Sequence, residues 1–237
     1  RGEYTRISGR QEATGEEVSQ NYFNLFPSAS MMLNLDEGRH SLMLDYRMNI
    51  DRPFYTHLNP FRIWTTENTF STGNPQLSAA LAHELILNYT FLYDYTVAVM
   101  WMNSGNAIFD YDEYIGNDVM KSSTGNFGTH NMLHLTADIN KRLLNGIWEI
   151  RLNASAGYET LDAALGETDM SYSTWYWMAD LRNTVNLSRQ HGLLMILSYS
   201  YSSPMRSLTW EVPERHYLNL SISKQFDFGG TLSLEAT

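Results

Sequence analysis

Residues 148–158 read Trp-Glu-Ile-Arg-Leu-Asn-Ala-Ser-Ala-Gly-Tyr, and this stretch decides the fold class. Every second residue from Trp148 to Tyr158 is apolar, whereas the residues between them, from Glu149 to Gly157, are polar or small. Successive side chains of a β-strand point to opposite faces of its sheet, so a period of two is typical of a strand with one apolar face. The stretch therefore predicts a strand.

The same alternation recurs on both sides of this stretch, while helical periodicity is scarce. We expect about eleven strands, at 2–9, 23–35, 40–50, 84–93, 96–104, 133–140, 148–158, 175–187, 193–203, 215–226 and 230–237. The region 105–126 is expected to add only extensions of neighbouring strands. The prediction is an all-β fold, an antiparallel up-and-down meander of about 10–12 strands.

The connections between these strands alternate strictly between short and long. Short turns are expected at 36–39, 94, 141–145, 188–192 and 227–229. Long connections are expected at 10–22, 51–82, 105–126, 159–170 and 204–214. A meander with short turns at one end and long loops at the other is typical of a transmembrane β-barrel, with periplasmic turns and extracellular loops. We therefore predict part of a large barrel.

Composition agrees with a barrel wall and excludes some partners. Charged residues make up only 18% of the chain and aromatic residues 13%, which suits aromatic belts at membrane interfaces. The mean hydropathy of −0.35 does not argue against a barrel, because its lumen is polar. A net charge of −10 makes nucleic acid an unfavourable partner, and without cysteine there is no thiolate metal site.

Three sequence motifs between residues 22 and 77 follow one another in a specific order. Residues 22–28 read Tyr-Phe-Asn-Leu-Phe-Pro-Ser, residues 52–61 read Arg-Pro-Phe-Tyr-Thr-His-Leu-Asn-Pro-Phe, and residues 73–77 read Gly-Asn-Pro-Gln-Leu. This series resembles the barrel portion of TonB-dependent receptors of the Bacteroidetes outer-membrane β-barrel family. Ser78-Ala79-Ala80 stands where that family usually has a segment like Lys-Pro-Glu.

The resemblance implies a barrel of about 22 strands around a plug domain, in a bacterial outer membrane. Residues 1–237 would then be one partial barrel domain, truncated at both ends and lacking the plug. The implied partners are outer-membrane lipid, a small-molecule or glycan ligand, and a periplasmic TonB-like protein that supplies energy through the plug.

The long connection 51–82 is the best candidate for ligand contact, because long loops tend to be functional. The residues expected to contact ligand, in this loop and the next long one, are Arg52, Tyr55, Asn59, Phe61, Trp64, Tyr111 and Tyr114. The motif residues expected to be structural are Pro53, Leu58, Pro60, Gly73, Asn74 and Pro75. In the alternative interpretation the loop is an ordered cap, and Arg52 and Asn59 only hydrogen-bond to loop backbone.

Two residue patterns resemble metal-binding sites, but the spacing or composition of each argues against metal binding. His130 and His134 share a strand face but would lie about 13 Å apart, too far to bind one ion. Asp110, Asp112 and Glu113 have the alternate spacing of calcium ligands, but no EF-hand glycine or distal glutamate accompanies them, which favours a solvated acidic loop. We predict no metal site, no cofactor and no catalytic residue, since no motif presents a nucleophile.

The sequence thus supports a TonB-dependent receptor that takes up a scarce nutrient, either a metal chelate or a glycan. Two alternatives stay open. One is a structural or adhesion barrel that transports nothing, and the other is a soluble carbohydrate-binding β domain whose apolar face is a core.

Overall fold

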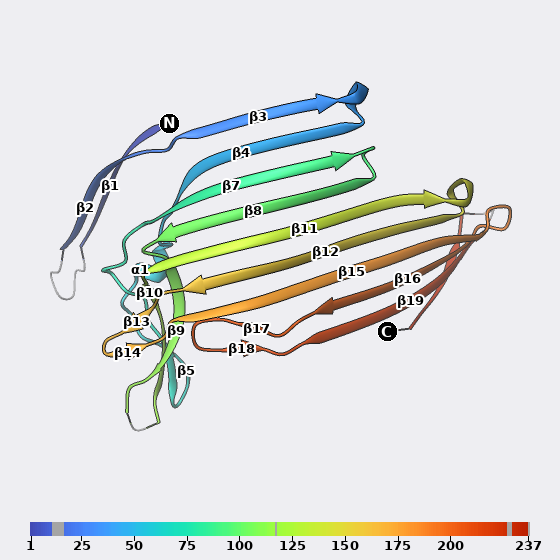
Figure 1. The fold of residues 1–237 in the computed structure, drawn as a ribbon. Helices are drawn as coiled ribbons and strands as arrows, with labels where there is room; N and C mark the ends of the chain where they lie inside the picture. The colour runs from blue at the N-terminus through green and yellow to red at the C-terminus, as the bar shows by residue number, and fades with distance from the viewer. Residues whose placement is uncertain (11–16, 117, 227–228, 237) are drawn as a thin grey trace.

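The computed structural model describes residues 1–10, 17–116, 118–226 and 229–236, and its centre is a ten-stranded antiparallel sheet (Figure 1). The sheet is a meander in which each strand lies beside the sheet strand that follows it in sequence. Its strands are β3 (Ser28–Leu35), β4 (His40–Asp51), β7 (Ala80–Phe91), β8 (Tyr95–Gly105), β11 (Thr129–Leu143), β12 (Trp148–Leu161), β15 (Tyr172–Ser188), β16 (Leu193–Ser202), β19 (Arg215–Gln225) and β20 (Thr231–Ala236). The predicted fold class is confirmed.

The strand register places the alternating apolar and polar residues on opposite faces of the sheet. Leu135 pairs with Ala156 of β12 and Val99 of β8, whereas its neighbour Thr136 pairs with Ser155 and Ala98. The apolar face is open along the sheet, and its large side chains include Leu85, Val99, Trp101, Leu135, Trp177, Leu197 and Ile222. A sheet that exposes such a face along several strands needs an apolar surrounding, as a barrel in lipid has.

The opposite face carries paired charges. Glu149 lies 2.6 Å from Arg151 and 3.6 Å from Arg142, and Arg47 forms an ion pair with Glu84. Opposite charges on adjacent positions of one sheet face satisfy each other where water has access. This is the polar, lumen-side face predicted from the alternation.

Turns and loops separate to the two ends of the sheet, as Figure 1 shows. The end of the sheet with short connections contains the 3-10 turns η1 (Asp36–Gly38) and η2 (Leu144–Gly146), and the tight turn at 92–94. The turn expected at 227–229 lies partly outside the described residues. The long-loop end also carries the hairpins β13 (Ala164–Leu165) with β14 (Thr168–Asp169), and β17 (Met205–Arg206) with β18 (Glu211–Val212).

Two strand predictions need correction. The segment 23–35 is not one strand: β2 (Glu17–Leu25) and β3 separate at Phe26-Pro27, and Pro27 lacks the N–H that a continuous ladder needs. β2 also occupies part of the connection expected at 10–22, and it pairs with β1 (Gly2–Arg10) in a separate two-stranded sheet.

The long connections also contain more structure than predicted. The region 105–126 holds a hairpin of β9 (Ile108–Tyr114) and β10 (Met120–Asn126), not strand extensions. The loop 51–82 holds β5 (Ile63–Thr66), β6 (Thr69–Ser71) and the four-residue helix α1 (Tyr55–Leu58). No helix in the described part of the chain is long and apolar enough to cross a membrane.

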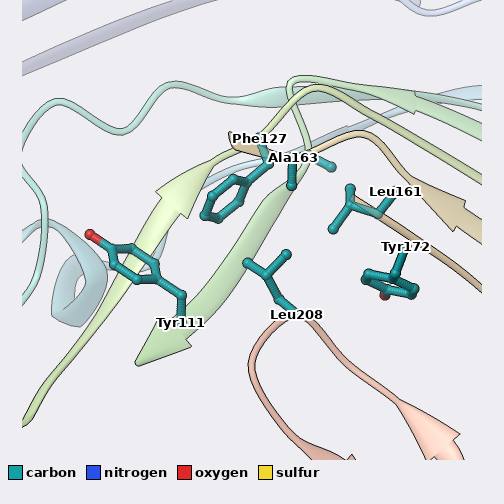
Figure 2. Packing of buried hydrophobic residues seen from close by; sticks show 7 residues of the cluster. Tyr111, Phe127, Leu161, Ala163, Tyr172 and Leu208 are labelled. Atoms are coloured by element: carbon teal, nitrogen blue, oxygen red, sulfur yellow. The ribbon is translucent and has the colours of Figure 1, made fainter. Parts of the chain in front are cut away.

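The buried core lies at the long-loop end of the sheet. Figure 2 shows Phe127, Leu161, Tyr172 and Leu208 packed toward one another, from β12, β15 and two loops. Leu161 pairs with Tyr172 and shares the lumen-side face of β12 with Glu149, twelve residues earlier. The loops therefore fold inward over the polar face and not outward from the rim.

Candidate functional site

The candidate site is built from two long loops that share one small sheet. Its strand order is β5-β6-β10-β9, and the central contact is the parallel pairing of Met120 with Thr69 and Ser122 with Ser71. The sheet thereby joins the loop 51–82 to the β9–β10 hairpin. Because every strand has a partner, these loops form an ordered roof at the long-loop end.

The roof depends on a close backbone approach at Gly73. Its N–H donates to the Asn59 carbonyl oxygen (2.8 Å), and the next N–H, of Asn74, donates to the His57 carbonyl oxygen (2.6 Å). A Cβ atom at position 73 would lie 2.5 Å from the His57 oxygen and 2.6 Å from the Asn59 oxygen. Only glycine fits there, which explains its place in the motif.

A cavity of about 430 Å³ opens beside this contact. The residues that line it come from the loop 51–82, the β9–β10 hairpin and the β17–β18 loop: Thr56, His57, Asn59, Phe61, Ile63, Ser71, Thr72, Gly73, Asp110, Tyr111, Asp112, Ser122, Ser123, Thr124, Thr209 and Trp210. Its volume lies within the range of small-molecule sites, roughly 300–1,000 Å³. We call it the roof pocket.

Two exposed carboxylates dominate the charge of the roof pocket. Asp110 accepts a hydrogen bond from the Thr124 hydroxyl (2.6 Å), and Asp112 accepts one from the Ser122 hydroxyl (2.5 Å). The hydroxyl of Thr209 accepts a hydrogen bond from the Asp112 backbone N–H (3.3 Å), which ties the third loop to the hairpin. No lysine or arginine is among the lining residues.

The nearest basic side chain of the hairpin, Lys121, is engaged elsewhere. Burial disfavours its charged form, but bonds to the Tyr111 hydroxyl (3.3 Å) and to Glu113 (3.2 Å) outweigh burial, so the Lys121 pKa lies above its ordinary value. Lys121 therefore stays protonated at neutral pH and neutralises Glu113, not the two aspartates of the roof pocket.

The structure brings together only part of the predicted contact set. Asn59, Phe61 and Tyr111 line the roof pocket. The Asn59 side chain accepts a hydrogen bond from the Phe61 N–H (3.2 Å), as the cap interpretation expects. The residues left off the pocket lining are Tyr55, Trp64 and Tyr114, all exposed.

Arg52 does not line the roof pocket; it lines a smaller neighbouring cavity that shares His57, Asp110 and Thr124 with the roof pocket. Among the described residues, its guanidinium donates to the Glu3 carboxylate of β1 (2.5 Å) and not to the loop backbone that the alternative interpretation expects. This contact joins the loop 51–82 to the first hairpin.

The remaining motif residues occupy the turns around this approach. The side-chain oxygen of Asn74 accepts a hydrogen bond from the Gln76 N–H (2.9 Å). This bond closes a short turn that contains Pro75 and is followed by the buried Leu77. Pro53, before α1, and Leu58, its last residue, are half-buried. Pro60 is exposed, and its carbonyl oxygen accepts a hydrogen bond from the Thr72 hydroxyl.

Ser78, which departs from the family pattern, is held by Asn126. The Ser78 N–H donates to the Asn126 side-chain oxygen (2.8 Å), and the Asn126 amide donates back to the Ser78 carbonyl oxygen (2.9 Å). This reciprocal pair fixes the descent into β7 without a lysine-proline segment.

Sequence reasoning missed several lining residues of the roof pocket, above all Trp210, Thr209 and the stretch from Ser122 to Thr124. Ser122 to Thr124 belong to a strand with almost no apolar alternation, and Trp210 lies in a connection that no motif marks. An exposed tryptophan in a predicted long loop was the one usable signal.

His134 forms a hydrogen bond with a tyrosine, whereas Nε2 of His130 is buried without a hydrogen-bond partner among the described residues. His134 Nδ1 lies 3.0 Å from the Tyr176 hydroxyl, and His130 Nε2 lies 3.5 Å from a Glu159 carboxylate oxygen. Within the described ranges, no group of three or more potential ligands could hold a metal ion.

The comparison with protein families decides the assignment. A model of the outer membrane protein beta-barrel family matches residues 1–237. The chain belongs to this family. The outer-membrane β-barrel family expected from residues 22–77 is thereby confirmed, and the chain is a protein of the bacterial outer membrane.

Two solved structures of receptors are similar in fold to this member of the outer membrane protein beta-barrel family. The siderophore receptor PirA from Pseudomonas aeruginosa has a TM-score of 0.62 at 11% identity, over 92% of this chain and 43% of PirA. The ferric enterobactin receptor PfeA from the same organism, in complex with enterobactin, has a TM-score of 0.55 at 13% identity, over 88% of this chain and 34% of PfeA. The chain spans less than half of either receptor, and no curated protein matches it.

Proposed function

We propose that this chain is a partial barrel domain of a TonB-dependent receptor that captures a scarce nutrient at its long-loop end and passes it inward. The observation that carries the proposal is the position of the roof pocket. Three inward-folded loops enclose it above a lumen-side face lined with paired charges. A capture site above a polar wall is the arrangement that uptake requires.

The proposal extends to energy coupling. Because an ordered roof and a polar wall do not by themselves move a ligand, we propose a plug domain in the lumen that responds to a periplasmic TonB-like protein. The polar face provides its contact surface, including Arg47 with Glu84, and Asn153, which donates to Asp138 (2.5 Å). We propose no catalytic role for this chain.

The alternative of a structural or adhesion barrel predicts a different behaviour. In that case removal of the protein would reduce attachment of cells to surfaces and leave nutrient uptake unchanged. The soluble carbohydrate-binding alternative does not agree with the family or with the open apolar face.

The test is uptake in cells that carry or lack the intact protein. We expect cells with the protein to accumulate radiolabelled nutrient from a mixed pool of ferric chelates and oligosaccharides. A protonophore should abolish accumulation while surface binding persists, because coupling needs the proton-motive force. Accumulation that continues unchanged in the presence of the protonophore would contradict the receptor proposal.

A further inference from the structure

The charge and chemistry of the roof pocket narrow the class of ligand, an inference that rests on the proposed function. We infer that the roof pocket binds a neutral oligosaccharide and not an anionic metal chelate.

The charge of the lining disfavours an anion. Asp110 and Asp112 are both exposed, and neither forms an ion pair with another described residue. The basic residues of the surrounding loops have other partners: Lys121 bonds to Glu113, Arg52 bonds to Glu3, and the guanidinium groups of Arg62 and Arg206 lie over the rings of Phe70 and Tyr172. A ferric chelate with net negative charge would meet two like charges and no cation, and like charges raise the free energy of binding.

The hydrogen-bonding capacity of the lining fits hydroxyl groups. A carboxylate offers about four acceptor positions, and Asp110 and Asp112 each use one of them for a side-chain hydroxyl. The remaining positions can accept hydrogen bonds from ligand hydroxyls, and bonds to an ionised acceptor are the stronger kind. Thr56 and Thr209 add hydroxyl groups that can donate or accept.

The aromatic residues provide a surface for sugar rings. Trp210 is 53% exposed and Phe61 is 60% exposed, and both line the roof pocket. The apolar face of a pyranose ring packs against an indole or phenyl ring, while its equatorial hydroxyls reach polar groups at the edge. Aromatic faces, unpaired acceptors and the absence of a lining cation together select a neutral, polyhydroxylated ligand.

The experiment measures binding by the intact receptor, purified in detergent. The probes are an array of neutral, acidic and amino oligosaccharides, together with a ferric tris-catecholate, which carries net negative charge. We expect neutral oligosaccharides to bind, and the acidic sugars and the ferric probe to bind at least tenfold more weakly. Failure of every neutral sugar to bind would overturn the inference, as would equal or tighter binding of the ferric or amino-sugar probe.

Variants then place the binding in the roof pocket. Trp210→Ala should weaken binding of the best neutral sugar at least tenfold. Trp175→Ala is the matched control, because Trp175 is 70% exposed on the lipid-facing side and does not line the pocket. Equal losses in the two variants would contradict a site at Trp210.

The carboxylates have their own pair of variants. Asp110→Asn with Asp112→Asn should weaken the neutral sugar and strengthen the ferric probe, because the repulsion disappears while hydrogen-bonding groups remain. Asp118→Asn, at the hairpin tip and outside the pocket, should change neither. Unchanged binding of both probes in the double variant would overturn the role of the carboxylates.

These measurements separate the inference from the proposed function. Binding needs no proton-motive force, so sugar binding without energised uptake would contradict only the transport proposal. Energised uptake of a ferric chelate without sugar binding would contradict only the ligand class.

Discussion

At the residue scale, Gly157 shows how a missing side chain organises the lumen-side face. The Tyr176 ring of β15 lies across Gly157 of β12, and its hydroxyl reaches His134 of β11 (3.0 Å). A Cβ atom at position 157 would lie 2.2 Å from the nearest ring atom of Tyr176. One glycine therefore lets a tyrosine bridge three strands and hold the His134 ring in place.

Gly157→Ala should destabilise the barrel, because the Tyr176 ring must leave its place and release His134. Such overpacking costs about 1–3 kcal/mol of unfolding free energy. Urea unfolding of the intact protein in liposomes measures the change. Gly105→Ala in β8 is the control, since a Cβ atom there meets nothing within 4 Å. A Gly157→Ala midpoint equal to that of the control would refute the packing argument.

Tyrosine–histidine pairs also recur on the lipid-facing side. The hydroxyl of Tyr46 lies 2.9 Å from His83 Nδ1, and the same contact joins Tyr89 to His40 and Tyr199 to His216. Each pair is diagonal across two neighbouring strands. The pairing satisfies polar tips near the membrane interface, where aromatic rings are favoured.

Tyr46→Phe should therefore cost about 1 kcal/mol of unfolding free energy, because it leaves His83 without its partner. Tyr217→Phe on the lumen-side face is the control, since its hydroxyl has no hydrogen-bond partner in the described residues. The measurement is the same urea titration. Equal midpoints for the two variants would show that the diagonal pair contributes nothing.

At the element scale, the loops show where sequence reasoning succeeds and where it stops. The strands of the large sheet were predictable because one face must be apolar, and burial in lipid imposes a period of two. The β9–β10 hairpin was not predictable, because its strands belong to a small sheet formed by the loops outside the membrane. Its inner contacts are made by hydroxyls such as Ser123, which donates to the Thr72 carbonyl oxygen, and no hydrophobic pattern marks them.

The candidate site was likewise predictable only in part. Asn59, Phe61 and Tyr111 were predicted as contacts and line the roof pocket: the contact of α1 with Gly73 positions Asn59 and Phe61, and the β9–β10 hairpin positions Tyr111. Trp210 approaches from a loop about a hundred residues further along the chain, and only the inward fold of the third loop brings it there. Such a long-range meeting leaves no local signal. The ligand contacts themselves stay a prediction.

Gly73→Ala tests the loop contact as a unit. The new Cβ atom would overlap the backbone oxygens of His57 and Asn59, so α1 must move away from the strands that follow. We expect the loop 51–82 to become susceptible to protease at the surface of intact cells, while the membrane strands stay resistant. Gly116→Ala in the next loop meets no neighbouring atom, although its positive φ adds local strain, and it should leave the loop 51–82 protected. Equal cleavage of loop 51–82 in both variants would contradict this prediction.

At the scale of the whole molecule, the sheet is open. Among the described strands, β3 and β20 each pair on one side only. An unpaired strand edge in lipid leaves backbone groups without hydrogen bonds, which costs several kcal/mol per group. The 237-residue chain by itself should therefore not form a stable monomer in micelles. A compact monomer that migrates faster in unheated than in heated electrophoresis samples would contradict this expectation.

The assignment of faces has a sharper test in two adjacent residues at the middle of β11. Leu135 lies on the apolar face and Thr136 on the lumen-side face, so the same substitution meets lipid at one position and water at the next. Leu135→Arg should destabilise the intact protein by about 2–4 kcal/mol, the cost of an arginine at the bilayer midplane. Thr136→Arg should cost well under that amount, because Asp138 lies on the same face two residues away. The two unfolding midpoints in liposomes decide the matter: equal values would refute the lipid orientation, and the reverse order would exchange the two faces and place the roof pocket outside the lumen.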